Sequence, residues 1–151
     1  ETAFLSMRRY EDEITYSLAG AASEVLGAPV DTCLELFGQH WVLETASKSY
    51  GMLLDAAGRD MIAFLRNMNA LHDRITSTFL DYVPPEFFIE EEGTTYKVHY
   101  VSQREGLNAF VVGLLKGLGT RFGTEVTILD QTDVPAEKGT HTVFTLELAP
   151  A

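Results

Sequence analysis

The hydrophobic pattern of the chain changes period at Pro84 and Pro85, and this change constrains the fold more than any other feature. Before the two prolines, apolar residues recur at steps of three and four, as in amphipathic helices. After them, apolar and polar residues alternate over short runs, as in strands. Two successive prolines end a helix, because they lack the N–H donor and clash with the preceding turn. We therefore expect one domain over residues 1–151, helical over about 1–86 and mixed over about 87–151.

Two helices are predicted in the first part before residue 60. In the first, apolar residues recur at helical spacing from Ile14 onwards, and Gly27 followed by Pro29 ends the helix. The second follows at once, and Asp31 or Thr32 is expected to cap its first turn. Apolar residues at helical spacing predict that one face of the second helix packs inward. That face consists of Leu34, Phe37 and Trp41.

The longest helix is predicted over roughly Met61 to Leu80, with Asp60 as its N-cap. Steps of three, four and seven define one stripe on it. The stripe consists of Leu65, Met68, His72, Ile75 and Phe79. An imidazole therefore lies where every neighbour on the stripe is apolar.

His72 has two interpretations. It can be a core histidine bonded to a backbone carbonyl, since buried polar groups are nearly always paired. It can also be an axial metal ligand in an apolar cleft, with one nitrogen on iron and the other fixed by an acceptor. The spacing alone leaves both interpretations open.

The second part of the chain is predicted to have the order ββαββ. Two alternating runs flank a turn at Gly93 and predict a hairpin, a helical segment follows, and two further alternating runs predict a second hairpin with a long polar loop. In order, the segments are FFIEE, TTYKVHYVS, LNAFVVGLLKGLGTRF, TEVTILD and HTVFTLEL. The fold class predicted is α+β, with a helical N-terminal lobe packed on a C-terminal lobe of antiparallel sheet and helix.

The stretch YVSQR ends the second predicted strand. A period of two puts Tyr100, Ser102 and Arg104 on one face and Val101 and Gln103 on the other. A guanidinium flanked by two hydroxyls matches a carboxylate, and each charge-assisted bond contributes about 1.5–3 kcal/mol when desolvated. The alternative is a solvent-exposed strand on which the guanidinium pairs, at little gain, with one of the 22 acidic side chains.

Composition excludes several classes of function. A net charge of −11 repels phosphate backbones and anionic lipid, so neither nucleic acid nor a membrane surface is an expected partner. The single cysteine, Cys33, can form no intrachain disulfide and no cysteine zinc cluster. Without a long apolar run or a signal peptide, a cytoplasmic location is expected.

Enzyme motifs are also missing from the sequence. Gly113 and Gly117 lie four apart in a predicted helix, which indicates close helix packing rather than a phosphate-binding loop. No nucleophile elbow or H-E-x-x-H pattern occurs, so we predict no catalytic residues and no enzymatic activity.

A haem would account for His72 through its iron and for the face of Tyr100, Ser102 and Arg104 through its carboxylates. The stretches that carry these residues resemble the haem nitric oxide/oxygen binding (H-NOX) family, which includes the sensor domain of soluble guanylate cyclase and stand-alone bacterial sensors. The resemblance runs from about Asp12 to Phe144. Its matching stretches are DEITYSLAGAASEVLG, LELFGQHW, FLRNMNALHDRI, YVPPEF, YVSQREGL and VVGLLKGLGTRFGTEV.

The resemblance implies a gas sensor with ferrous haem b, whose iron is bound by His72 alone. The family's Y-x-S-x-R signature, which holds the propionates, is present unbroken as Tyr100, Ser102 and Arg104. Pro85 corresponds to the proline that presses on the macrocycle. Further candidates for haem contact are Met68, on the His72 stripe, and Trp41, which is equally well a core aromatic.

The resemblance further implies a ligand and an output. Oxygen-binding members carry a distal tyrosine where this chain has Ala109, beside Phe110, so we predict selectivity for nitric oxide over oxygen, with carbon monoxide as a further ligand. The expected output partner is a histidine kinase, a diguanylate cyclase or a guanylate cyclase. Family members have additional helices upstream of the segment that starts here; either these helices have been lost by proteolysis or truncation, or the pocket is unusually open. The alternative is a haem-free small-ligand or protein-interaction domain with the same fold.

Overall fold

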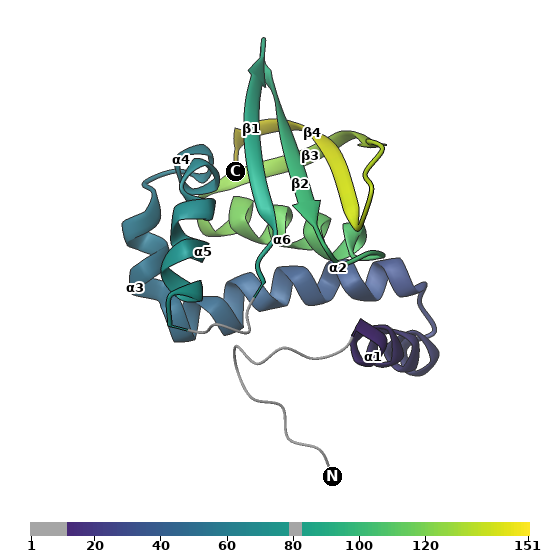
Figure 1. Cartoon of the computed structure of the whole chain (residues 1–151). Helices are drawn as coiled ribbons and strands as arrows, with labels where there is room; N and C mark the ends of the chain where they lie inside the picture. The colour runs from purple at the N-terminus through teal and green to yellow at the C-terminus, as the bar shows by residue number, and fades with distance from the viewer. Residues whose placement is uncertain (1–11, 79–82) are drawn as a thin grey trace.

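The two prolines mark the boundary between helices and sheet in the computed structural model, which describes residues 12–78 and 83–151. Figure 1 shows a sheet, then α6, then α2, then α1 in successive layers, with α3, α4 and α5 gathered at one end. The helical part comprises α1 (Asp12–Leu26), α2 (Val30–His40), the π-helix η1 (Trp41–Ala46), α3 (Ser47–Ala57), α4 (Met61–Arg66) and α5 (Met68–Thr76). The second part comprises β1 (Glu86–Glu92), β2 (Thr95–Ser102), α6 (Asn108–Arg121), β3 (Thr124–Asp133) and β4 (Thr140–Pro150). The predicted α+β class and the order ββαββ are confirmed.

The first two helices follow the prediction except at one cap. α1 ends before Gly27, whose φ of +63° is the left-handed conformation that glycine adopts at little cost. The N-cap of α2 is Pro29, with no side-chain capping bond, so the predicted cap at Asp31 or Thr32 is wrong. The Pro29 carbonyl already accepts from Cys33 N at 3.2 Å, so both predicted caps fall inside the helix.

The predicted long helix is two helices. The Asp60 carboxylate caps the first, accepting from Ala63 N at 2.8 Å as expected. Asn67, with φ −92° and ψ −1°, separates α4 from α5, and its side chain donates to the Ala57 carbonyl at 2.5 Å. The i→i−4 backbone bonds nevertheless continue through Asn67, whose N–H donates to the Ala63 carbonyl and whose carbonyl accepts from Leu71 N. The predicted C-terminal residues of this helix, Phe79 and Leu80, lie outside the described residues.

All four strands form one antiparallel sheet in the order β1-β2-β4-β3. Both predicted hairpins are present, and the register pairs Phe87 with Tyr100 and Val98 with Phe144. β3 extends through Asp133 and so absorbs the start of the predicted polar loop. Because α6 contacts β3 and also packs on α2, the sheet and the N-terminal helices share one core.

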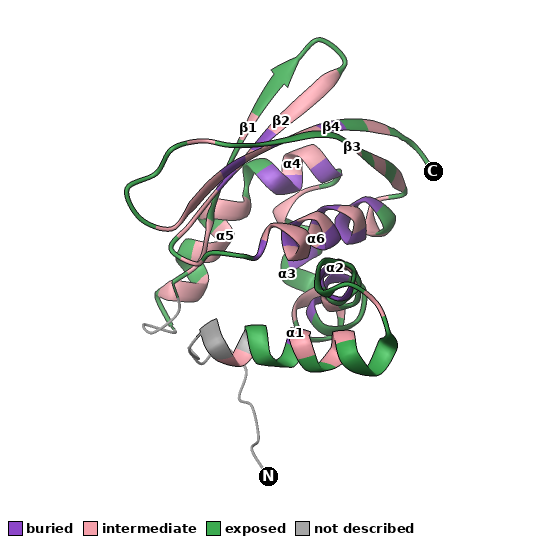
Figure 2. Ribbon diagram, turned by 90° about the vertical axis from the view of Figure 1, so that its right-hand side faces the viewer, coloured by how far each residue is buried: buried purple, intermediate pink, exposed green. Residues whose placement is uncertain are grey.

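The core lies between the sheet and the helices. Figure 2 shows buried positions concentrated on α4, α6 and the strands facing them, whereas α1 is largely exposed. Fully buried side chains include Phe64, Leu65, Leu115, Phe144 and Leu146. Cys33 is a buried free thiol. Within the described ranges, no helix combines the length and apolarity needed to span a bilayer.

Close packing of α2 on α6 depends on glycines from both helices. A Cβ atom added at Gly113 would lie 2.0 Å from the Glu35 carbonyl oxygen, and one at Gly38 would lie 2.3 Å from the Phe110 carbonyl oxygen. The close packing predicted from Gly113 and Gly117 is therefore confirmed. The predicted inward face of α2 is wrong at Phe37, which is 54% exposed and stacks on Phe110 with ring centroids 5.4 Å apart.

Candidate functional site

A cavity of about 310 Å³ lies between the helices and the sheet, at the lower end of the usual range for small-molecule sites, about 300–1,000 Å³. Its lining is mostly apolar and comes from η1, α3, α4, α5, α6, β2 and the start of β1. Only a few of the lining side chains have polar atoms. These are Trp41, Tyr50, His72, Tyr100, Ser102 and Arg104.

The predicted stripe of the long helix faces this cavity. Leu65, Met68, His72 and Ile75 all line it, although Asn67 interrupts the helix between the first two. The fifth member, Phe79, lies outside the described residues. The main contacts of α5 are with α4 and β1.

His72 has the carbonyl partner that both interpretations require. Its Nδ1 atom lies 3.2 Å from the Pro85 carbonyl oxygen. Burial lowers the pKa of the imidazole below its ordinary value of 6.5, while the bond to Pro85 and the charge of Asp73 oppose that shift. The neutral ring then donates through Nδ1 and carries its lone pair on Nε2, the form in which histidine binds metals.

Tyr100, Ser102 and Arg104 line the same cavity, but only the first two belong to the strand. β2 ends at Ser102, so placing Arg104 on the strand face was wrong. A turn returns Arg104 to the cavity instead: its backbone N–H donates to Ser102 Oγ at 3.1 Å, and its carbonyl accepts from Thr140 Oγ1 at 2.9 Å. Gln103 is exposed, as expected.

The other predicted contact residues, Pro85, Met68 and Trp41, also line the cavity. Ala109 does not line it. Ala109 packs against the small cluster of Ala19, Leu34 and Leu107, whereas Leu107 and Phe110 also reach the lining. Among the residues that the structure describes, no group of three or more His, Cys, Asp or Glu side chains could hold a metal ion.

Tyr50, which was not among the predicted site residues, brings a phenol to the lining. It lies in α3, a helix that the sequence analysis did not assign. A signal was present, because Val42, Ala46, Tyr50 and Leu54 recur every four residues and all line the cavity.

A family model described as Haem-NO-binding matches residues 1–129. The chain belongs to this family, the H-NOX family. Soluble guanylate cyclase gcy-31 of Caenorhabditis elegans is 28% identical over 130 residues, which cover 85% of this chain and 18% of that protein. The beta-2 subunit of soluble guanylate cyclase from Rattus norvegicus is 28% identical over 121 residues, 76% of this chain and 18% of the subunit. This H-NOX chain therefore matches less than a fifth of either cyclase.

Solved H-NOX structures share the fold at low identity. A single-residue mutant of T. tengcongensis H-NOX superposes with a TM-score of 0.82 at 18% identity, covering 100% of this chain and 81% of that one. An S. oneidensis H-NOX protein in the Fe(II)NO ligation state superposes with a TM-score of 0.80 at 17% identity, covering 99% of this chain and 82% of that one. The H-NOX family binds haem.

The residues of the cavity fit such a group. Apolar walls suit a flat macrocycle, the imidazole of His72 suits its iron, and the guanidinium of Arg104 suits its acidic edge.

Proposed function

We propose that this chain is a haem-dependent gas sensor, with His72 as the axial protein ligand of ferrous haem b. The observation that supports the proposal is that an imidazole, fixed through Nδ1 by a carbonyl, lines one apolar cavity together with a guanidinium and two hydroxyls. When bound, haem b would supply the iron at which a diatomic gas binds.

The remaining residues have distinct proposed roles. Tyr100, Ser102 and Arg104 hold the propionates. Pro85 presses on the macrocycle, and its carbonyl orients His72. Met68 and Trp41 contact the faces of the macrocycle from α5 and η1.

Nitric oxide is the proposed ligand, in preference to oxygen, and carbon monoxide is a further one. Oxygen gains negative charge on binding ferrous iron and needs a donor, whereas nitric oxide binds without one. The mostly apolar lining supports this preference, as does Ala109, which adds no donor.

The proposed output is a movement of α5 read by another protein or domain, such as a histidine kinase, a diguanylate cyclase or a guanylate cyclase. His72 would hold the haem from α5, so binding of a gas there would bias the position of this helix. Hydrogen bonds connect α5 to β1. The side chain of Asn69, in α5, donates to the Phe87 carbonyl at 3.0 Å and accepts from Phe87 N at 2.9 Å. A shift of α5 therefore reaches β1 directly.

Absorption spectroscopy tests the proposal. The purified, reduced protein is expected to show an intense Soret band that shifts when nitric oxide is added. His72→Gly and Arg104→Ala are expected to lose most of the bound haem. His40→Gly is the matched control, because His40 is exposed and outside the cavity lining. Colourless wild-type protein after haem reconstitution would refute the proposal and favour the haem-free alternative.

A further inference from the structure

Residues 103–107 form a turn, the Arg104 turn, that carries the guanidinium into the cavity. β2 ends at Ser102 and α6 begins at Asn108, so neither a strand nor a helix sets the backbone of this turn. Arg104 is half-buried and lines the cavity, whereas the residues on either side of it are exposed. A long side chain binds a carboxylate more tightly when its position is fixed in advance, because it then loses less freedom on binding. The contacts that hold the turn therefore affect how well Arg104 can bind a propionate.

β4 contacts the Arg104 turn directly. The Thr140 hydroxyl donates to the Arg104 carbonyl at 2.9 Å, and this bond is half-buried. The preceding residue, Gly139, has a φ of +73°, and a Cβ atom added there would lie 2.0 Å from the Ser102 carbonyl oxygen. The backbone that leads into β4 therefore lies against the start of the turn.

α1 contacts the second half of the same turn. The Tyr16 hydroxyl donates to the Glu105 carbonyl. The ring of Tyr16 lies beside Gly106, where an added Cβ atom would be 3.4 Å from Cε1 of the ring. Leu107, at the end of the turn, is buried in one cluster with Ala19 of the same helix. α1 thus holds the turn by a hydrogen bond and by packing.

Two hydroxyls from distant parts of the sequence therefore bond to adjacent carbonyls of one short segment. Within the turn, the Arg104 N–H also donates to Ser102 Oγ at 3.1 Å. Neither Tyr16 nor Thr140 lines the cavity. Each of them therefore acts on a bound group through the turn rather than by contact.

We propose that Thr140 and Tyr16 are positioning residues, which hold the Arg104 turn so that its guanidinium meets the carboxylate edge of the haem. This inference rests on the proposed function. Thr140 should have the larger effect, because its half-buried bond goes to Arg104 itself. Tyr16 is 39% exposed, so water can partly replace its bond to Glu105.

Thr140→Val and Tyr16→Phe remove the two hydroxyls with little change of shape and test the inference. The readout is the rate at which the holoprotein loses haem to an excess of a haem-free globin. Loss of one hydrogen bond is expected to raise this rate about 3- to 10-fold in Thr140→Val and about 2- to 3-fold in Tyr16→Phe. Thr140→Ser keeps a hydroxyl and should retain the wild-type rate.

Matched controls come from the same sheet. Thr145→Val lies on β4 and Tyr96→Phe on β2, and both residues are outside the cavity lining and the Arg104 turn. Both variants should lose haem at the wild-type rate.

A double-mutant cycle separates positioning from a general loosening of the fold. Arg104→Lys is the background, because it keeps a cation for the haem but lacks the planar fork that a guanidinium presents. If Thr140 acts through this fork, Thr140→Val should add little to the effect of Arg104→Lys. The same should hold for Tyr16→Phe.

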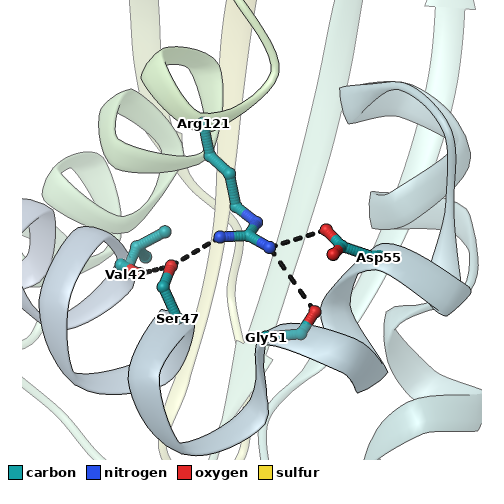
Figure 3. A network of polar contacts seen from close by, with 5 residues as sticks. All are labelled: Val42, Ser47, Gly51, Asp55 and Arg121. Carbon is teal, nitrogen blue, oxygen red and sulfur yellow. Dashed lines mark hydrogen bonds and ion pairs between the residues drawn. The ribbon is translucent and has the colours of Figure 1, made fainter.

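Arg121 provides the comparison for general loosening, because it supports another wall of the cavity. Figure 3 shows its guanidinium donating to Ser47 Oγ at 2.6 Å, to the Gly51 carbonyl at 3.5 Å and to Asp55 Oδ1 at 2.7 Å. These bonds bridge a break at Tyr50, whose φ of −134° and ψ of 20° are not helical. They reach η1 and α3 but not the Arg104 turn, so the effect of Arg121→Met should add fully to that of Arg104→Lys.

Amide hydrogen exchange in the haem-free protein gives a readout that needs no cofactor. The Arg104 N–H bonds to Ser102 Oγ, so its exchange rate reports whether the turn is held. It should exchange about 2- to 10-fold faster in Thr140→Val and at the wild-type rate in Thr145→Val.

A wild-type rate of haem loss in Thr140→Val or in Tyr16→Phe would overturn the role of that residue and leave the proposed function standing. Effects that add fully to that of Arg104→Lys would also refute the inference, because they would show a structural role alone. Absence of a Soret band in the wild type would refute the proposed function itself.

Discussion

The imidazole of His72 links protonation to stability, because burial lowers its pKa in the fold against the opposing effects of Pro85 and Asp73. The unfolded chain, with its ordinary pKa of 6.5, binds the proton first as the pH falls. The free energy of unfolding of the haem-free protein should therefore fall as the pH drops below 6.5, and should not depend on this group well above it. Urea unfolding at several pH values, for wild type and His72→Gln, measures the difference.

Subtracting the His72→Gln curve cancels the other titrating groups, which both proteins share. Parallel curves for the two proteins would show that burial does not disfavour the charged ring. The same protonation removes the lone pair that a metal requires, so haem retention should also weaken at acid pH.

Individual site residues could be predicted from the sequence where the helix or strand period alone sets the direction of the side chain. His72 reached the cavity because helix spacing places it on an apolar stripe, and Tyr100 because strand spacing places it on the face that it shares with Ser102. Arg104 reached it through a turn held by Ser102 and Thr140, which no period encodes. Tyr50 continues the four-residue spacing of Val42 and Ala46, but the backbone break at Tyr50, which Arg121 bridges from far away in sequence, leaves no local pattern.

At the scale of elements, α2 and α6 pack so closely that a methyl group added at their contact tests the packing between helices. Gly113→Ala would place its Cβ atom 2.0 Å from the Glu35 carbonyl oxygen, so the helices would have to separate. We expect a loss of about 1–3 kcal/mol in the free energy of unfolding, the usual cost of overpacking. Chemical denaturation measures it.

Gly20→Ala in α1 is the control, because nothing lies within 4 Å of the added Cβ. It should stabilise the protein by about 0.5–1 kcal/mol, the gain expected from helix propensity alone. Equal effects at the two glycines would mean that the α2–α6 contact tolerates a methyl group.

Elements with one uninterrupted pattern were predicted well, namely α1, α6 and the two hairpins. The errors lie where tertiary bonds override propensity. α4 and α5 are separated at Asn67, whose backbone leaves the helical region while its side chain donates to the Ala57 carbonyl, ten residues away in sequence. α3 was missed because η1 shifts the helical period just before it, and Gly51 weakens the remaining signal.

At the scale of the molecule, two polar side-chain contacts among the described residues join the α4–α5 pair to β1, and they differ in strength. Asn69 makes two half-buried hydrogen bonds with the Phe87 backbone, whereas Arg66 pairs with Glu91 where the two side chains are 51% and 56% exposed. Exposed ion pairs contribute about 0–1 kcal/mol, while leaving two partly buried backbone groups unpaired costs about 1–3 kcal/mol each. The amide of Asn69 is therefore the stronger of these two contacts with β1.

Asn69→Leu should separate ligand binding from the response of the sheet. The variant should keep its haem, because Asn69 lies outside the cavity lining, yet nitric oxide should no longer change amide hydrogen exchange across β1 and β2. Arg66→Gln, which breaks only the exposed link, should respond like the wild type. Since α5 touches the sheet mainly through β1, an unchanged response in Asn69→Leu would mean that the signal leaves through α4 or α6 instead.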